Sequence, residues 1–445
     1  MGGVVRNRPS PGRRLAAAAI LAAVLAGPGA AHATAVLAVR HWSAPDHTRI
    51  VVDLDGPAAY RHRELADPPR IAVDITHGRF RFPLDPVPIE DGLIQRIRFN
   101  VLKMSGKAQV VLDLDASARY DVFALEAYED KPPRIVIDVK RPVDLRPRPP
   151  RPVTERVIGP DSFGDFLVMI DPGHGGEDPG RRNPGGVKEK ELALVFSGEL
   201  RDEIDRRRGY RAELTRTGDY FLSLRRRREI AEERGAHLFV SVHFNAASVR
   251  SARGTEVFFV SLRGADDRAT LELVNAENSA DLVGGVPPRD RETSDALARM
   301  LVDLRQNDSV ERSQRLATLI TDNITGLRGI RTRRVQQAGF AVLKSLFIPA
   351  VLVEAGFLTN RDDVRFFQSK NDRRRYVRSL ADGIVMYCEE IEIPRLGWKM
   401  HTVASGESLS QIAHVYAMDV SALKGANNLS GDEIFAGQRL RVRPR

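Results

Sequence analysis

Three short apolar segments of this chain each end at a histidine or glutamate, or at a short turn that contains one. This pattern constrains the fold more than any other feature of the sequence. The segments cover residues 166–170, 238–242 and 350–353, and each is predicted to be a buried β-strand. They lead to His174, His243 and Glu354, while Glu189 follows a glycine turn and opens a predicted helix. Open α/β sheets gather their active groups at the carboxyl ends of strands, so we expect these four side chains to meet.

The surrounding region, residues 161–392, alternates strand and helix patterns, which predicts an α/β domain with a mostly parallel sheet. Further strands are expected at 211–215 and 255–260, and helices at 190–208, 224–233, 309–327 and 374–390. Residues 261–308 interrupt the alternation and contain a helical pattern from 269 to 282. Insertions of this length in compact domains are usually functional or disordered.

The four polar residues suit metal-dependent hydrolysis. Two imidazoles and one carboxylate with an open fourth position form a common catalytic zinc shell. A second carboxylate beside the attacking water would serve as general base and then as general acid. A single histidine after a strand is more often structural, so the prediction rests on all four residues together.

Several motifs make the region from about 165 to 390 resemble the zinc-dependent N-acetylmuramoyl-L-alanine amidases of bacterial cell-wall metabolism. The motifs are IleAspProGlyHisGlyGly at 170–176, GluLys at 189–190, LeuThrArg at 214–216, SerValHisPheAsn at 241–245 and LeuValGluAlaGlyPheLeuThrAsn at 352–360. The resemblance implies that His174, Glu189 and His243 bind Zn²⁺ and that Glu354 is the catalytic carboxylate. It departs at 181–182, where two arginines replace the family's usual small residues.

The same resemblance implies a reaction and its control. The enzyme would cleave the amide between N-acetylmuramic acid and L-alanine of the stem peptide, in wall remodelling and daughter-cell separation. Members of the division-amidase branch carry an insertion that lays a glutamate on the zinc until a protein activator removes it. Glu277 is the candidate for that glutamate, with a solvated helix face as the alternative. Arg216 and Asn245 are candidates for orienting substrate, with ordinary structural roles as the alternative.

Residues 34–140 repeat themselves at an offset of about sixty positions. ArgIleValValAspLeuAsp at 49–55 returns as GlnValValLeuAspLeuAsp at 109–115, and ProProArgIleAlaValAspIle at 68–75 returns as ProProArgIleValIleAspVal at 132–139. We expect a duplicated β-sandwich in which each copy buries one face against the other. The recurring aspartates are interpreted as solvent-facing strand positions rather than metal ligands. This block resembles the AMIN domain, which implies placement of the enzyme on the wall or at the division site.

Two further segments lie on either side of the central α/β region. Residues 141–160 begin with alternating prolines and arginines and are predicted to be a semi-stiff linker. Residues 398–443 resemble a LysM module, which implies a strand–helix–helix–strand fold. Its loops near Gly406 and Asn427 are the expected N-acetylglucosamine contacts.

The first 33 residues predict a secretory signal peptide that exports the protein to the periplasm, where it would associate with the cell wall or septum. Arginines precede the apolar run 15–25, and AlaHisAla at 31–33 is a small-x-small cleavage pattern. The run is about half the roughly 20 residues needed to span a bilayer, so we expect no stable membrane span after cleavage. Arg13-Arg14 leaves the export route open between general secretion and the twin-arginine system.

Composition agrees with an exported wall enzyme and disfavours a nucleic-acid partner. The 445-residue chain has one cysteine and hence no internal disulfide. Its net charge of +9 arises from basic residues scattered among nearly as many acids, a balance that suits anionic wall polymers better than DNA. Two rival functions remain: a zinc peptidase that cuts within the stem peptide, and a non-catalytic wall-binding scaffold.

Overall fold

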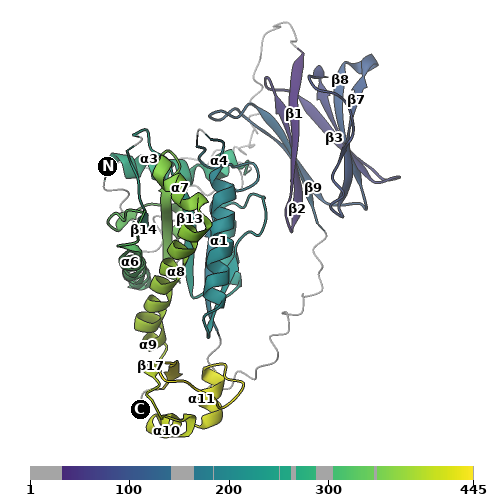
Figure 1. Ribbon diagram of the computed structural model, residues 1–445. Coiled ribbons are helices and arrows are strands. Elements are labelled where there is room, and N and C mark those ends of the chain that lie inside the picture. Colours follow the sequence, from purple (N-terminus) through teal and green to yellow (C-terminus); the bar gives the residue numbers. More distant parts are fainter. Residues whose placement is uncertain are drawn as a thin grey trace, which may run out of the picture.

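The computed structural model describes residues 33–141, 165–183, 185–249, 251–261, 267–286, 304–344 and 348–443. The predicted signal peptide and linker lie outside them, apart from Ala33 and Arg141. Figure 1 shows three parts: a β-rich part, a central α/β part, and a small part below it that carries the carboxyl terminus.

The amino-terminal part is a sandwich of two five-stranded sheets, as the repeats predicted. The sheet orders are β5-β1-β2-β10-β9 and β3-β4-β8-β7-β6. The strands are β1 Thr34–Ser43, β2 His47–Leu54, β3 Tyr60–Leu65, β4 Arg70–Thr76, β5 Gly78–Phe80, β6 Val87–Pro88, β7 Ile94–Leu102, β8 Lys107–Leu114, β9 Tyr120–Leu125 and β10 Arg134–Lys140, with a 3-10 turn at Lys103–Ser105. Alternate residues such as Ile50 and Val52 fill the shared core.

The two sequence copies do not form one sheet each, and that expectation was wrong. β2 of the first copy pairs with β10 of the second, and β4 of the first pairs with β8 of the second. Each copy therefore contributes one of these repeated strands to each sheet. Neither sheet can complete its backbone hydrogen bonds from one copy alone, so the interleaving makes the sandwich a single folding unit.

Four of the six recurring aspartates are buried rather than open to solvent, whereas Asp55 and Asp115 are exposed as expected. Asp53, Asp74, Asp113 and Asp138 are all buried. Each pairs with an arginine on a neighbouring strand, as in the two hydrogen bonds of 2.7 and 2.6 Å from Arg49 to Asp138. Among the described residues the only group with metal-ligand spacing lies elsewhere. The aspartates thus anchor arginine side chains along the outer faces of the sandwich.

The central part contains a six-stranded mixed sheet of order β12-β11-β13-β16-β14-β15. The first four strands are parallel, β14 runs antiparallel to β16, and β15 runs parallel to β14. The strands are β11 Phe166–Pro172, β12 Tyr210–Leu214, β13 Leu238–Asn245, β14 Glu256–Val260, β15 Gln336–Ala338 and β16 Ala350–Phe357. The prediction of a largely parallel sheet is confirmed, with its β14–β15 edge reversed relative to the other four strands.

Helices cover both faces of this sheet. The helices are α1 Glu189–Asp205, α2 Leu224–Glu233, α3 Arg268–Asn278, α4 Ala280–Val283, α6 Leu304–Ile324, α7 Arg361–Gln368 and α8 Lys370–Tyr387, with a 3-10 turn at Ala341–Leu343 and a π turn at Cys388–Glu392. Helices α1, α6 and α8 share one core with Val168 and Ile170, whereas α2 and α3 share the opposite core with Leu167 and Met169. Strand alternation thus divides β11 between the two cores.

The carboxyl-terminal part has the predicted strand–helix–helix–strand order. After the short helix α9 (Ile393–Arg395) come β17 Lys399–Thr402, α10 Leu409–Val415, α11 Val420–Ala426 and β18 Arg439–Val442. Leu409, Ile412 and Ala413 form its core as expected. The side chain of Asn427 is buried and bonds to the backbone of Leu423 and Arg441, so that side chain holds the fold and is not available to a glycan.

Candidate active site

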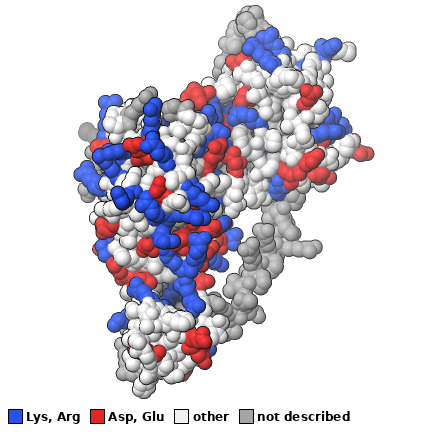
Figure 2. All heavy atoms as spheres, viewed as in Figure 1, with Lys and Arg blue, Asp and Glu red and all other residues white. Residues whose placement is uncertain are grey.

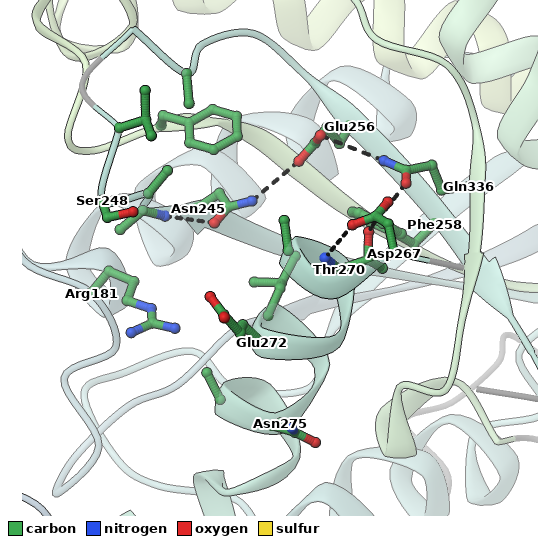
Figure 3. Close-up of a pocket in the computed structure, with 18 of the residues that line it drawn as sticks. Arg181, Asn245, Ser248, Glu256, Phe258, Asp267, Thr270, Glu272, Asn275 and Gln336 are labelled. Carbon is green, nitrogen blue, oxygen red and sulfur yellow. Dashed lines mark hydrogen bonds between the residues drawn. The ribbon is translucent and has the colours of Figure 1, made fainter. Parts of the chain in front are cut away.

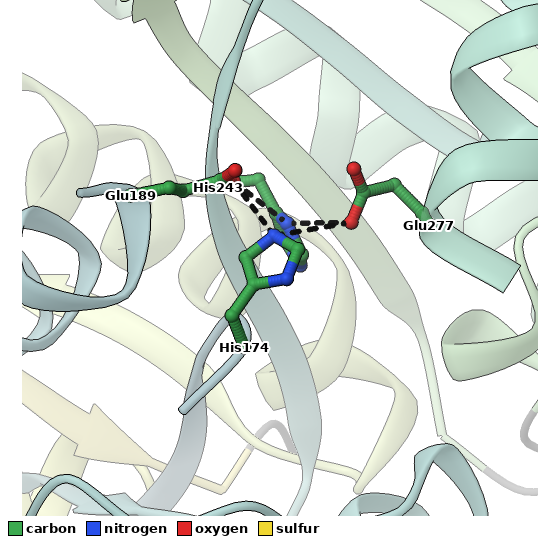
Figure 4. A group of neighbouring side chains, drawn as sticks. All are labelled: His174, Glu189, His243 and Glu277. Carbon is green, nitrogen blue, oxygen red and sulfur yellow. Dashed lines mark hydrogen bonds and ion pairs between the residues drawn. The ribbon is translucent and has the colours of Figure 1, made fainter. Parts of the chain in front are cut away.

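Four buried side chains from distant parts of the sequence converge on one point (Figure 4). His174 Nε2 lies 3.0 Å from Glu189 Oε1 and 3.3 Å from Glu277 Oε2. His243 Nδ1 lies 3.1 Å from each of the same two oxygens. The four donor atoms all lie within 4.8 Å of one another. The structure therefore brings His174, Glu189 and His243 together, and adds Glu277 from the insertion.

The parallel sheet and one helix start account for this convergence. β11, β13 and β16 are adjacent and parallel, so their carboxyl ends share one edge of the sheet. Glu189 is the first residue of α1, where its charge suits the helix dipole. Its Oε1 accepts the backbone N–H of Phe244, next to His243, at 2.9 Å, and its Oε2 accepts that of Arg181 at 2.8 Å.

Two glycines are required for the close approach of these side chains. A Cβ at Gly173 would lie 2.5 Å from the ring of His243. A Cβ at Gly180 would lie 2.6 Å from both Glu189 and His174, and its φ of +62° is itself one that favours glycine. These two glycines thus leave room for both imidazole rings and for the carboxylate of Glu189.

The electrostatics of the cluster favour charged carboxylates and a cation between them. Burial lowers the pKa of His243, but the charges of Glu277 and Glu189 outweigh burial and raise it to about 10. Burial raises the pKa of Glu189, but the two histidines outweigh it and hold that pKa well below its ordinary range. Opposite charges within hydrogen-bond distance produce such shifts.

Asp178, a residue that sequence reasoning missed, orients His174. Its carboxylate lies 2.7 Å from His174 Nδ1, which leaves Nε2 to face the cluster. Burial by itself lowers the pKa of His174, yet the charges of Asp178, Glu189 and Glu277 raise it well above its ordinary value. Carboxylates behind ligand histidines are typical of metal sites, and the i, i+4 position of Asp178 after His174 was the available sequence signal.

Glu354 lies beside the cluster, but its carboxylate makes no hydrogen bond to the other described residues there. It pairs in register with His243 on the neighbouring strand and is fully buried. Among the described residues neither of its carboxylate oxygens has a hydrogen-bond partner. Burial and the nearby charges of Glu189, Glu277 and Glu256 raise its pKa well above the ordinary range, against the opposing effect of His243. A buried acid in this state can carry a proton near neutral pH.

Glu277 reaches the cluster because α3 is amphipathic. Thr270, Leu273, Val274 and Glu277 form its buried face, and Leu273 and Val274 pack into the core beneath the sheet. The helix begins at an Asp267 cap and is tied at its end by Asn278, which contacts Gly339 and Ala341. The helical pattern predicted for the insertion is confirmed, and its buried face points at the two histidines.

A groove of about 1020 Å³ lies between α3 and the reversed edge of the sheet (Figure 3). Asn245 lines it and donates to Glu256 at 3.1 Å, and Glu256 in turn accepts from Arg333. Arg181 also lines this groove, on the side away from Gln336 (Figure 3). Asn245 is therefore placed where it can contact a bound molecule, whereas Glu256 and Arg333 are lining residues that sequence reasoning did not identify.

Arg216, in contrast, faces away from any groove, and the structure does not support its expected contact with substrate. It is completely buried and donates to the backbone carbonyls of Pro172, Gly173, Gly218 and Lys190. Arg227 acts in the same way on the carbonyl of His174, at 2.7 Å. Both arginines therefore hold the loop that carries His174. The cost of leaving loop carbonyls unsatisfied explains why they are buried there.

The donor set fits a metal ion. His174 Nε2 and Glu277 Oε2 are buried atoms with no hydrogen-bond partner among the described residues, and they face each other. Two neutral imidazole nitrogens and two carboxylate oxygens are ordinary metal ligands, and a bound cation would satisfy all four at once. The cluster is thus a metal-binding arrangement in which one histidine is held by a carboxylate behind it.

Comparison with known proteins finds a matching family model for each of the three parts. Residues 168–386 match the family model described as N-acetylmuramoyl-L-alanine amidase, 38–139 match the AMIN domain and 401–443 match the LysM domain. The chain is 30% identical over 375 residues to the N-acetylmuramoyl-L-alanine amidase AmiC of Neisseria meningitidis, covering 79% of this chain and 89% of that one. It is 40% identical over 221 residues to AmiA of Salmonella typhimurium, covering 50% of this chain and 75% of AmiA.

A solved structure, the N-acetylmuramoyl-L-alanine amidase AmiC2 of Nostoc punctiforme, aligns at 27% identity with a TM-score of 0.37, covering 51% of this chain and 99% of that one. From the identity to AmiC over most of both chains, and from the three domain matches in this order, the chain belongs to the N-acetylmuramoyl-L-alanine amidase family.

Proposed function

We propose that this peptidoglycan amidase of cell-wall remodelling binds Zn²⁺ through His174, Glu189 and His243. The observation that carries the proposal is the spacing of the donor atoms. A tetrahedral zinc site with bonds of about 2.0–2.1 Å has donors roughly 3.3 Å apart. The four donor pairs given above lie 3.0–3.3 Å apart, close to that spacing, and the two imidazole nitrogens suit zinc better than calcium, which takes oxygen ligands.

Glu354 is the proposed general base and acid for cleavage of the amide between N-acetylmuramic acid and L-alanine. Its raised pKa and its oxygens without partners among the described residues suit a group that accepts a proton from water and returns it to the leaving amine. When bound, zinc supplies Lewis-acid chemistry that polarises the carbonyl and acidifies water. Asp178, Arg216 and Arg227 hold His174 in place, and Asn245 is the proposed contact for substrate.

The product of digestion tests this assignment. Purified sacculi treated with the enzyme should release intact stem peptides that begin with L-alanine, which mass spectrometry identifies. The Glu354→Gln variant, with metal retained, is the inactive control. Peptides cut internally would instead establish the rival stem-peptide peptidase, and tight binding to sacculi without any released peptide, in the Glu277→Ala variant as well as in the wild type, would establish the non-catalytic scaffold.

Glu277 is proposed to occupy the fourth zinc position and so to hold the enzyme inactive. Its Oε2 lies 3.3 Å from His174 and 3.1 Å from His243, against 3.0 and 3.1 Å for Oε1 of Glu189. A ligand there excludes the water required for attack, so a protein activator that prefers a displaced α3 would shift the population to the active form. Replacing Glu277 with alanine should raise basal hydrolysis. Unchanged basal hydrolysis would show that Glu277 is not the inhibitory ligand.

We further propose export by the signal in residues 1–33 and a place at the periplasmic cell wall, with residues 141–160 as linker. No helix among the described residues is long and apolar enough to span a membrane. The face in Figure 2 intersperses basic with acidic side chains, unlike the continuous basic patch that nucleic-acid phosphates require. Amino-terminal sequencing of the mature protein from the periplasmic fraction tests the cleavage after Ala33.

A further inference from the structure

The AMIN domain contacts the end of the helix pair that carries Glu277. One outer face of the sandwich, formed by β2, β9 and β10, meets the turn that follows α4. We call the residues Arg49, Leu125, Arg134 and Val136 on that face the clamp surface. Arg49 Nη1 donates to the carbonyl of Gly284, and Arg134 Nη2 donates to Leu282 and Val283 at 3.1 and 3.3 Å.

Arg49 and Arg134 supplement the backbone of this helix end, in which the Leu282 carbonyl also accepts the N–H of Gly285 at 3.4 Å. The last carbonyls of a helix lack intrahelical donors and carry partial negative charge, so guanidinium groups stabilise them. Arg134 is 1% exposed and Arg49 is 8% exposed, so water contributes little to either contact. Charge-assisted hydrogen bonds in such surroundings are stronger than surface ones.

Apolar packing accompanies these hydrogen bonds. Val51 and Val136 belong to a small cluster on the outside of the sandwich, separate from its core, yet they are 0% and 1% exposed. A Cβ added at Gly285 would lie 3.0 Å from Leu125, which shows how closely the turn after α4 rests on this face. On its other side the turn meets Phe221, which would lie 2.2 Å from a Cβ at Gly284. The turn is thus held between the two domains.

A second contact from the same sheet reaches the loop that carries His174. Arg40 donates to both oxygens of Glu177 at 2.5 and 3.0 Å, and Lys131 donates to the carbonyl of Glu177 at 3.0 Å. The side chain of Glu177 is buried, and the next residue is Asp178, which orients His174. The AMIN domain therefore holds both the metal loop and the helix pair opposite it.

We propose that the AMIN domain is an intramolecular clamp that keeps α3 and α4 closed over the metal site. Withdrawal of the clamp surface leaves the α4 carbonyls and the outer valines exposed to water, which favours movement of the helix pair and release of Glu277. Because coupling between two sites is reciprocal, any wall component that binds the AMIN domain better in the detached state also activates the enzyme. The inference rests on the proposed inhibitory role of Glu277.

The test uses full-length protein and the variants Arg49→Met and Arg40→Met/Arg49→Met. The matched control is Arg98→Met, because Arg98 also holds an aspartate of the sandwich with two hydrogen bonds but does not reach α4. Arg49→Lys is the third variant, since it keeps a cation beside Asp138 and protects the fold of the sandwich. Amide hydrogen exchange is measured over 268–286, and basal hydrolysis of sacculi is measured in parallel.

Loss of a charged hydrogen bond should speed exchange in 268–286 on the order of tenfold. Basal hydrolysis should rise most in the variants whose exchange is fastest, while the control stays at wild-type values. Wild-type exchange in all three Arg49 variants overturns the clamp, whatever Glu277→Ala does. Faster exchange together with unchanged hydrolysis in Glu277→Ala supports the clamp and instead refutes inhibition by Glu277. Equal acceleration in Arg98→Met would also overturn the clamp, because the effect would then come from general loosening of the sandwich.

Discussion

Replacing Asp178 tests whether the carboxylate behind His174 contributes to metal binding. Asparagine has the same shape and can still accept a hydrogen bond from His174 Nδ1 across the observed 2.7 Å, so only the charge is lost. A charged acceptor is stronger than a neutral one by about 1 kcal/mol, which corresponds to a loss of zinc affinity of about fivefold. Alanine removes the acceptor from a buried ring, so its loss should approach the hundredfold known for such positions, about 2.8 kcal/mol.

The assay is a competition titration of metal-free protein with zinc and a coloured chelator at neutral pH. Asp219→Asn is the matched control, because Asp219 also accepts a backbone N–H from the same loop, at Gly176, but is half exposed and touches no proposed ligand. Wild-type zinc affinity in Asp178→Ala would refute the reasoning. Equal losses in the Asp178→Asn and Asp219→Asn variants would show that the loop, rather than the ring, had been disturbed.

Four further changes test other parts of the structure. Glu354→Gln should lower turnover by roughly 10²–10⁴-fold with zinc retained, whereas His174→Ala should lose both, as measured by hydrolysis and by metal content. Gly173→Ala should weaken zinc binding in the same titration, because its methyl group would lie 2.5 Å from the ring of His243. Burial raises the pKa of Asp91, but backbone amides and two hydroxyl groups outweigh it and lower the pKa to about 2. After allowance for solvent screening, Asp91→Asn should therefore cost the sandwich on the order of 1 kcal/mol at pH 7, and in calorimetry the difference should shrink as pH falls below about 4 and through 2.

The local sequence was sufficient to predict the elements of the central domain and the places of its polar residues. Apolar runs before His174, His243 and Glu354 predict strands because buried strands need continuous apolar residues, and a glycine turn before Glu189 marks a helix start. Helix α7 was missed because its apolar residues are few, and its start depends on capping by Asn360.

Tertiary structure alone decided what the remaining residues do. Arg216 lies in a motif beside the site, but its direction depends on carbonyls of segments that only the fold brings near it. The interleaving of the two repeats depends on strand pairing between copies. The contact between Arg49 and the end of α4 joins residues 235 positions apart. Periodicity and turn chemistry act over a few residues and can be read from the chain, whereas the partner of a buried charge is chosen by packing across the whole molecule.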